Sequence, residues 1–237
     1  MDDVIFVAGA TGYTGRELVR LATARGLTTI AHVRPDSKQL AAWRDRFEAM
    51  GATVDSTPWE AGALAEAFAK WRPTVVFALL GTTRARGRAE AAEGQVSSYE
   101  TVDYGLTVKL LEASAALEPK PRFVYLSSAG VPAREPRRGS YLWARFAVEQ
   151  ALREGDVPYT IARPSIITGP DRDDARPGER AAAVVVDGTL GLLEVLGGKR
   201  LAARYRSTTN EVLAGALLRL ALDPAAAGKT VESEGLR

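Results

Sequence analysis

The sequence predicts an α/β fold in which a parallel sheet is covered by helices on both faces. Two observations support this prediction. Short apolar runs typical of buried strands alternate with helical patterns along most of the chain. The connections between them are short and carry glycine, proline or polar residues. Because such crossovers are right-handed, we expect a doubly wound sheet that binds ligands at the carboxyl ends of its strands.

The first strand and the turn after it have the clearest pattern. Residues 4–8 are a short apolar run, and residues 9–15 (GATGYTG) lead from it into a helical pattern. Gly9 allows a sharp turn, Gly12 allows the backbone to approach a pyrophosphate, and Gly15 allows the helix to pack on the sheet. The helix N-terminus offers N–H groups and a positive dipole end to phosphates. The layout predicts a dinucleotide site, and a turn that needs glycine for packing alone is the alternative. The expected contacts are Gly9, Thr11, Gly12, Tyr13, Thr14 and Gly15.

The later elements follow in order. Further strands are predicted at residues 28–33, 53–55, 74–80, 123–126 and 159–163. Helices are predicted at residues 37–50, 60–70, 98–117 and 141–153. The regular alternation stops after Pro164, where we expect an irregular loop at 169–178, a broken helix at 181–196, a helix at 207–222 and an edge strand at 229–233.

The chain therefore reads as one domain over residues 1–237. Its core covers residues 1–163, a small C-terminal substrate lobe covers about 164–200, and a closing helix and edge strand cover 207–233. The sequence shows no internal repeat and no low-complexity linker.

Composition excludes several classes of function. The formal net charge is only +2 and the arginines are spread along the chain, which argues against nucleic-acid binding. With no cysteine, the chain has no disulfide, thiolate zinc site or cysteine nucleophile, and it shows no other metal-ligand spacing. From the acidic start we expect no secretory signal, and no apolar run approaches membrane-spanning length. We expect a cytoplasmic protein with a small-molecule substrate, without a metal, a nucleic-acid partner or a membrane partner.

The residue after the second predicted strand usually selects the nicotinamide cofactor. Arg34 stands there with no acid beside it on the strand, and Lys38 is close enough to contribute. A guanidinium forms two-point, charge-assisted bonds to a phosphate, which favours NADP(H) over NAD(H). A solvated arginine at a strand end is the alternative. Asp55, at the end of the third strand, is a candidate acceptor for the adenine amino group, with an ordinary loop carboxylate as the alternative.

Several pieces of the sequence resemble a known group of proteins. The GATGYTG turn is similar to the opening motif of the short-chain dehydrogenase/reductase superfamily in its extended or atypical branch, which has the NAD(P)-binding Rossmann fold. The similarity runs from residue 4 to about residue 222 and is weakest after Glu179. The pieces that resemble the Tat-interacting-protein oxidoreductases and NmrA-like relatives are Leu80–Arg84, Leu126–Ser128, Tyr141-Leu142 with Val148-Glu149, Arg163-Pro164 and Arg176–Glu179.

The resemblance implies an active site made of a serine or threonine, a tyrosine and a lysine four residues after the tyrosine. Ser128 and Tyr141 match the first two, whereas Arg145 occupies the lysine position. A tyrosine with an ordinary pKa of about 10 must exchange a proton near neutral pH, and a cation one helical turn away favours the phenolate. Arginine keeps the charge and can hydrogen-bond a ribose, but it does not readily release a proton. Arg145 therefore preserves the electrostatics and places turnover in question. Further cofactor contacts are expected from Leu80, Gly81, Thr82, Ser127, Arg145 and Pro164.

Two functions remain open. The first is an NADPH-dependent carbonyl reductase in which Tyr141 protonates the substrate oxygen, Ser128 holds it and Arg145 assists the tyrosine and binds the ribose. The second is a cofactor-binding sensor that has lost turnover, as the NmrA-like resemblance suggests. Simpler roles stay open as well, since both serines can satisfy backbone groups at a strand end and Tyr141 can pack beside a helix cap. His32, within a strand, is interpreted as structural. By resemblance, the helices at 98–117 and 141–153 are candidate faces of a homodimer.

Overall fold

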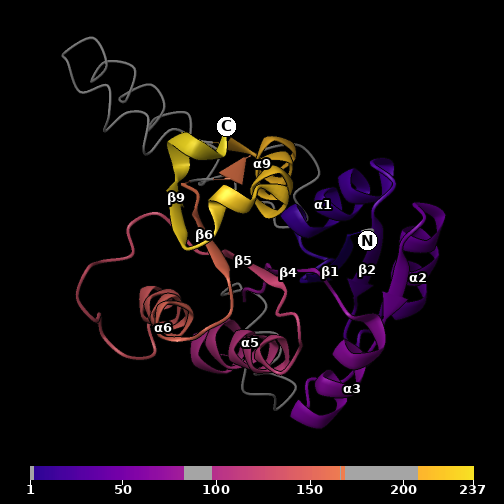
Figure 1. The fold of residues 1–237 in the computed structure, drawn as a ribbon, viewed down its shortest axis with the longest axis horizontal. Helices are drawn as coiled ribbons and strands as arrows, with labels where there is room; N and C mark the ends of the chain where they lie inside the picture. The colour runs from indigo at the N-terminus through magenta and orange to yellow at the C-terminus, as the bar shows by residue number, and fades with distance from the viewer. Residues whose placement is uncertain (1–2, 83–97, 166, 169–207) are drawn as a thin grey trace.

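A parallel sheet crosses the centre of the molecule (Figure 1). The computed structural model describes residues 3–82, 98–165, 167–168 and 208–237. Within these residues seven strands form the main sheet: β1 (Val4–Ala8), β2 (Thr28–His32), β3 (Thr53–Asp55), β4 (Val75–Ala78), β5 (Arg122–Leu126), β6 (Tyr159–Arg163) and β9 (Lys229–Glu232). Their order is β3-β2-β1-β4-β5-β6-β9, and every pairing is parallel. The predicted doubly wound fold is confirmed.

The central strands are buried on both faces, which explains why they are continuous apolar runs rather than alternating ones. Residues Ile5 to Ala8 of β1 have no exposed surface, and Ile5 pairs with Thr29 of β2 on one side and with Val75 of β4 on the other. Ile5 and Val7 belong to the hydrophobic core on one face of the sheet, while Phe6 and Ala8 belong to the core on the other face. The period-two geometry of a strand thus distributes one apolar run between two helical layers.

Helices cover both faces of this sheet (Figure 1). One layer contains α1 (Tyr13–Ala24), α2 (Leu40–Ala49) and α9 (Asn210–Leu222), whose buried residues pack in the same core cluster. The opposite layer contains α3 (Ala61–Trp71), α5 (Thr107–Ala115) and α6 (Tyr141–Glu154). Within the described ranges, no helix combines the length and the apolar character needed to cross a membrane.

The structure changes two predicted helices. The helix expected at 98–117 begins as a π-helix, η1 (Tyr99–Leu106), and only then continues as α5. The helix expected at 207–222 begins at Asn210, because Thr208–Thr209 form a short strand, β8, that pairs with β7 (Ile167–Thr168). Short strands of this kind leave too few residues for a period-two pattern, so sequence periodicity does not reveal them.

Of the remaining predictions for the C-terminal part of the chain, one is confirmed and the others lie outside the described residues. The predicted edge strand is present as β9, which pairs with β6, and short 3₁₀ turns flank it at Pro224–Ala226 and Ser233–Leu236. The predicted loop at 169–178, the broken helix at 181–196 and thus most of the substrate lobe lie outside the described residues.

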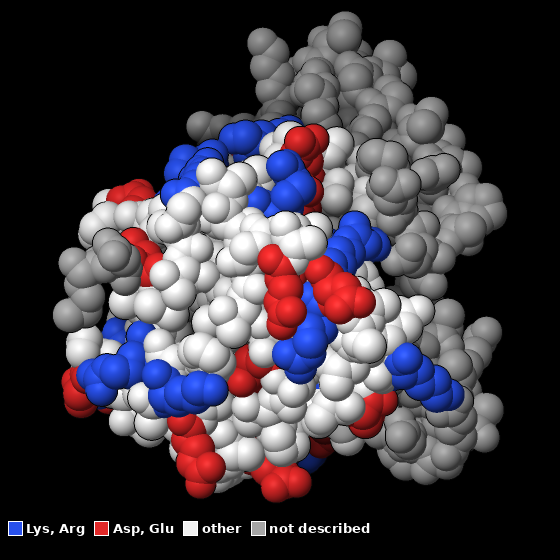
Figure 2. Space-filling model, turned by 90° about the vertical axis from the view of Figure 1, so that its right-hand side faces the viewer, with Lys and Arg blue, Asp and Glu red and all other residues white. Residues whose placement is uncertain are grey.

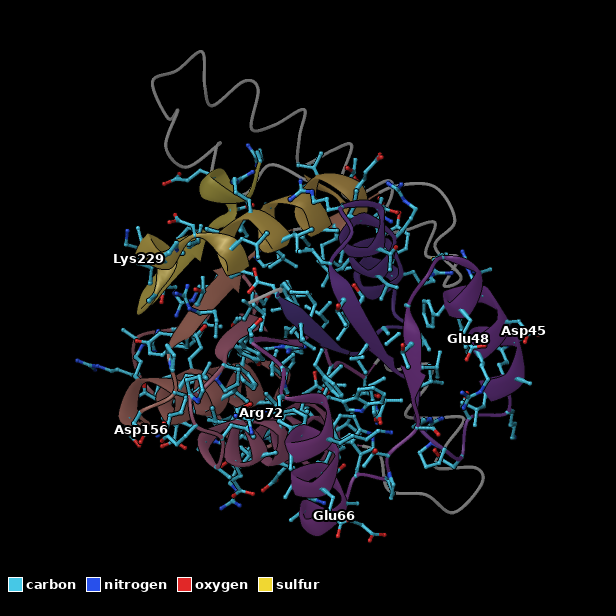
Figure 3. The ribbon with its side chains drawn as sticks, turned by 45° about the vertical axis from the view of Figure 1, so that its right-hand side comes forward. Asp45, Glu48, Glu66, Arg72, Asp156 and Lys229 are labelled. Carbon is cyan, nitrogen blue, oxygen red and sulfur yellow. The ribbon has the colours of Figure 1, made fainter. Side chains whose placement is uncertain are left out.

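Charged side chains lie mainly at the periphery. On the face shown in Figure 2, basic and acidic residues are interspersed among uncharged ones. The six labelled side chains in Figure 3 lie on the outer sides of helices, at turns and on the edge strand, and all are exposed: Asp45, Glu48, Glu66, Arg72, Asp156 and Lys229. Charges that lie in the interior are therefore exceptions that need a physical reason.

Candidate functional site

A cavity of about 420 Å³ opens at the carboxyl ends of the strands, beside β1. The strand order reverses here, because β1 pairs with β2 on one side and with β4 on the other. In open α/β sheets this switch point is where ligands bind. The walls come from the glycine turn after β1, the residues after β2 and β4, η1 and two tryptophans, Trp43 and Trp59.

The turn after β1 requires its glycines. Gly9 has φ of +86°, and a Cβ there would lie 2.6 Å from the carbonyl oxygen of Leu79. A Cβ on Gly15 would overlap the carbonyl oxygen of Gly9, so only glycine lets α1 cross the turn at this distance. Gly12 is the exposed N-cap residue of α1 and, as a glycine, makes no side-chain capping bond to this helix. The turn thus forms a cradle with a helix N-terminus above it, which fits a pyrophosphate.

The expected turn residues fall into two groups. Gly9, Thr11 and Gly12 line the cavity. Thr14 and Gly15 are buried beneath it, and the Tyr13 hydroxyl donates a hydrogen bond of 3.4 Å to the carbonyl oxygen of Thr168.

The segment after β2 brings opposite charges into the cavity wall. Arg34 lines the cavity with its side chain 37% exposed, at the place that the sequence predicts for the cofactor-selecting residue. Asp36 lines it as well, and its Oδ1 lies 3.6 Å from Nε of Arg34. Asp36 follows the strand rather than lying on it, so the pattern at the strand end does not single it out. The wall therefore offers a guanidinium for a phosphate and a carboxylate for a hydroxyl.

Asp55 does not belong to the described cavity wall. Its carboxylate accepts hydrogen bonds from the backbone N–H of Thr57 (3.2 Å), the hydroxyl of Thr57 (3.0 Å) and Nε1 of Trp71 (3.0 Å). This geometry favours the loop-carboxylate alternative over a contact with adenine.

His32 lies in the cavity wall, where its Nε2–H donates to the carbonyl oxygen of Thr57 at 2.8 Å. Burial lowers the pKa of His32, so the ring is neutral near neutral pH, and it packs edge-on against Trp59. These contacts agree with a structural role.

The segment after β4 forms the opposite wall. The strand predicted at residues 74–80 ends at Ala78 in the structure. Leu79, Leu80 and Gly81, which follow it, line the cavity. The hydroxyl oxygen of Thr82 is buried and has no hydrogen-bond partner among the described residues. A polar atom in that condition suits a ligand that supplies the missing bond.

Tyr141 and Arg145 lie together at the start of α6. Ser140 caps this helix by accepting a hydrogen bond from the backbone N–H of Trp143, which fixes the start of the helix at Tyr141. The guanidinium carbon of Arg145 is 5.0 Å from the centroid of the Tyr141 ring, and the ring of Tyr99 packs edge-on at 5.5 Å. The tyrosine and the cation are therefore adjacent, as their spacing predicts.

Ser128, the expected catalytic serine, follows β5 and is half-buried. Its hydroxyl donates to the carbonyl oxygen of Ala129 at 3.1 Å.

Both Nη atoms of the Arg145 guanidinium bind protein partners, whereas its Nε is buried without a hydrogen-bond partner among the described residues. Arg145 is 5% exposed, and its Nη1 donates to the carbonyl oxygens of Leu80 (3.3 Å) and Leu126 (3.1 Å) and to the Tyr125 hydroxyl (3.1 Å). Its Nη2 donates to Asp103 Oδ1 at 2.8 Å. Although burial opposes the charge, Tyr125, Tyr141 and Asp103 raise the pKa of Arg145, so it stays protonated. The structure does not bring Arg145 to the described wall of the cavity.

Asp103 is the site residue that sequence reasoning missed. It has no exposed surface and lies on η1, between Val102 and Leu106 of the cavity wall. The sequence gives no distinct signal, because η1 also carries the acid Glu100, and only the burial of Asp103 shows that it needs a partner. The partner is 42 residues away in the sequence and becomes apparent only once the fold is known.

A second buried cluster holds Ser127, which was expected to contact the cofactor. Its hydroxyl donates to Glu149 Oε1 at 2.7 Å. Glu149 also accepts hydrogen bonds from Arg163 (2.6 and 2.9 Å) and Arg153 (2.7 Å), and Arg163 reaches Glu232 of β9 at 3.1 Å. Burial alone would raise the pKa of Glu149, but the bonds from Arg163, Ser127 and Arg153 lower it.

This cluster ties β5, α6, β6 and β9 together. The other expected cofactor contact in this region, Pro164, is buried directly after Arg163.

The sheet, the glycine cradle and the cavity at the switch point define a Rossmann-type nucleotide-binding domain. Comparison with protein families places the chain more specifically. Residues 9–188 match the model of a family described as NAD(P)H-binding. The chain belongs to this NAD(P)H-binding family.

Individual relatives agree with this assignment. A ceramide reductase from Caulobacter vibrioides (strain NA1000 / CB15N) is 31% identical over 168 residues, which are 70% of this chain and 47% of that protein. The chain therefore spans about half the length of this curated relative.

Solved structures of low sequence identity share the fold. A putative NAD-dependent epimerase/dehydratase from Bacillus halodurans is 18% identical with a TM-score of 0.66, covering 98% of this chain and 97% of its own. The UDP-glucose 4-epimerase of Brucella ovis, solved in complex with NAD, is 18% identical with a TM-score of 0.63, covering 98% of this chain and 77% of its own. A closer relationship to NmrA-like proteins stays a prediction.

Proposed function

We propose that the protein is an NADPH-dependent oxidoreductase that reduces the carbonyl group of a small molecule. Membership of the NAD(P)H-binding family supports a nicotinamide coenzyme, and the relative named a ceramide reductase supports reduction as the reaction. The observation that carries the proposal is Arg34 in the wall of a cavity whose floor is the glycine cradle.

The preference for NADPH follows from the chemistry of this wall. The 2′-phosphate of NADPH accepts two parallel hydrogen bonds from a guanidinium, whereas the 2′-hydroxyl of NADH suits a carboxylate such as Asp36. Arg34 and Asp36 lie 3.6 Å apart, so the phosphate competes with Asp36 for the guanidinium. Since a dianionic phosphate attracts a cation more strongly than a single carboxylate does, we expect NADPH to bind more tightly.

In the proposed reaction, NADPH held in this cavity would supply a hydride to the carbonyl carbon. Tyr141 donates its phenolic proton to the carbonyl oxygen, and the Ser128 hydroxyl holds that oxygen by a hydrogen bond. Arg145 supplies a positive charge at the face of the Tyr141 ring, which stabilises the phenolate left after proton transfer. Because Arg145 keeps its proton, water must reprotonate the tyrosine.

The binding of Arg145 to Asp103 also favours a second function. A guanidinium held by a buried carboxylate offers less net charge to Tyr141, and a protein with a weakly activated tyrosine would bind the coenzyme without turnover. This is a coenzyme sensor.

Calorimetry and an assay of turnover separate these functions. Titration with NADPH and with NADH should give heat for both and a lower Kd for NADPH. Oxidation of NADPH in the presence of a panel of aldehydes and ketones should then follow. Binding without oxidation of NADPH on any carbonyl compound would support the sensor and contradict the reductase. Absence of heat with either coenzyme would contradict both.

A further inference from the structure

We propose that Asp103 is a positioning residue that, together with Arg145, clamps the backbone of residues 80–82 against the coenzyme cavity. This inference rests on the proposed function, since it takes the cavity to be the coenzyme site. It assigns to Arg145 a role through the backbone of these residues rather than through the ribose or a proton relay.

The two carboxylate oxygens of Asp103 have different partners. Oδ1 accepts a hydrogen bond from Nη2 of Arg145 at 2.8 Å, and Oδ2 accepts one from the backbone N–H of Thr82 at 2.9 Å. Both Nη atoms of Arg145 donate to the carbonyl oxygen of Leu80 at 3.3 Å. The ion pair therefore holds the 80–82 segment at both ends, through one carbonyl group and one amide group.

Gly81, between these two contacts, lies directly against the ion pair. A Cβ on Gly81 would be 3.2 Å from Nη2 of Arg145 and 3.6 Å from Oδ1 of Asp103. Leu80 and Gly81 also line the cavity. The position of this part of the cavity wall is thus set by the side chains behind it.

The π-helical form of η1 links the clamp to the rest of the wall. Val102 and Leu106 of η1 line the cavity, while Asp103 points inward with no exposed surface. The hydroxyl of Thr107 donates to the backbone carbonyl of Asp103 at 2.6 Å, which helps to satisfy the backbone where η1 gives way to α5. A π-helical turn widens the spacing of its side chains, and such turns are frequent at functional sites.

Arginine and aspartate form this clamp as a unit. A buried guanidinium without Asp103 would be an uncompensated charge. A lysine at position 145 has one point of charge and lacks the planar fork that lets Arg145 reach Leu80, Leu126, Tyr125 and Asp103 together.

A double-mutant cycle on coenzyme affinity tests the clamp. The Kd for NADPH is measured by calorimetry for the unsubstituted protein, Asp103→Asn, Arg145→Lys and the double variant. Asparagine has only one side-chain oxygen, so its amide N–H₂ faces either Nη2 of Arg145 or the backbone N–H of Thr82, and both of these are donors. Asp103→Asn therefore loses a charged hydrogen bond and should raise the Kd for NADPH about tenfold. Arg145→Lys should do the same. Because both changes disrupt one unit, the double variant should bind no more weakly than the weaker single variant.

Thr160→Val is the matched control for loss of a buried hydrogen bond. Thr160, on β6, donates to the carbonyl oxygen of Ala226 at 2.8 Å and is fully buried, but it does not touch the 80–82 segment. It should lower the melting temperature and leave the Kd for NADPH unchanged.

Tyr125→Phe is a second test of the clamp, for use if Asp103→Asn does not fold. It removes only the hydroxyl that Arg145 binds, retains the aromatic ring, and should raise the Kd about threefold.

The outcomes distinguish the clamp from the proposed function. An unchanged Kd in Asp103→Asn or, where that variant does not fold, in Tyr125→Phe would overturn the clamp while the coenzyme site stands. If the factors by which the two single substitutions raise the Kd multiply in the double variant, the clamp would also be overturned. Absence of NADPH binding by the unsubstituted protein would overturn the proposed function together with the clamp.

Discussion

The cavity beside β1 and the ion cluster beside β5 and β6 both lie at the carboxyl ends of the strands, but their charged residues have different roles. In the cavity, Arg34 is partly exposed, and the carboxylate of Asp36 lies 3.6 Å from its Nε. In the cluster, Glu149 is fully buried and accepts hydrogen bonds from Ser127, Arg153 and Arg163 at 2.6–2.9 Å. The comparison indicates that charges in the cavity wall are partly exposed to solvent, whereas charges in the cluster are buried and maintain the structure. Substitutions should therefore change affinity in the first region and stability in the second.

The largest effect is expected in the cluster. Glu149→Gln leaves Arg163 without its principal carboxylate partner, and breaking a buried ion pair from one side costs about 3 kcal/mol of the free energy of unfolding. Urea denaturation measures this change. The control is Glu48→Gln, which removes one partner of the exposed pair with Arg44 and should change stability by less than about 0.5 kcal/mol. Equal effects of the two changes would contradict the structural role of the cluster.

The next largest effect is expected in the cavity. Arg34→Ala removes the bidentate partner of the 2′-phosphate and should raise the Kd for NADPH about 10- to 100-fold, with little change for NADH. Calorimetry with both coenzymes provides the measurement. Arg44→Ala is a matched control, since Arg44 has a similar exposed fraction of 41% but does not line the cavity. A parallel loss of affinity for NADH would show that Arg34 does not select the phosphate.

Acid should weaken the cluster beside β5 and β6. Because the pKa of Glu149 is lower in the folded protein than its usual value of 4.5, the carboxylate contributes its full stabilisation above that value. This contribution is lost as the pH falls through the folded-state pKa. Denaturation at a series of pH values below 4.5 should show a steeper loss of stability in the unsubstituted protein than in Glu149→Gln. Parallel curves would mean that another carboxylate controls the acid transition.

The smallest effect is expected from Asp36→Asn. Removing a carboxylate 3.6 Å from Arg34 removes one competitor for its guanidinium and should lower the Kd for NADPH about two- to threefold. The same change should raise the Kd for NADH, because a ribose hydroxyl loses a charged acceptor. A ratio of the two Kd values that does not move would exclude Asp36 from the choice of coenzyme.

The fold could be predicted because it depends on local patterns. The continuous apolar runs of β1 and β4 are what a doubly covered parallel sheet requires, and Gly15 is imposed by backbone contacts inside one short turn. The strand pair β7–β8 could not be predicted, because each strand has two residues and the pairing joins distant segments.

The candidate site could be predicted only in part, because some of its contacts join segments that are distant in the sequence. Arg34 follows from its place at a strand end, and Tyr141 follows from the resemblance to the short-chain dehydrogenase/reductase superfamily. The partners that determine what Arg145 and Ser127 do, Asp103 and Glu149, are separated from them by 42 and 22 residues and meet them only in three dimensions. A motif identifies which side chains are present, and the fold decides which of their hydrogen bonds remain for a ligand.

The two indole rings in the cavity wall have a practical consequence. Trp43 and Trp59 line the cavity, whereas Trp71 and Trp143 donate hydrogen bonds to Asp55 and Glu135 elsewhere. Half of the four tryptophans thus stand where a nicotinamide coenzyme would dock. Since reduced nicotinamide absorbs light at the wavelengths that indoles emit, occupancy of the cavity should quench the intrinsic fluorescence of the protein. The chain therefore carries its own optical reporter of coenzyme binding.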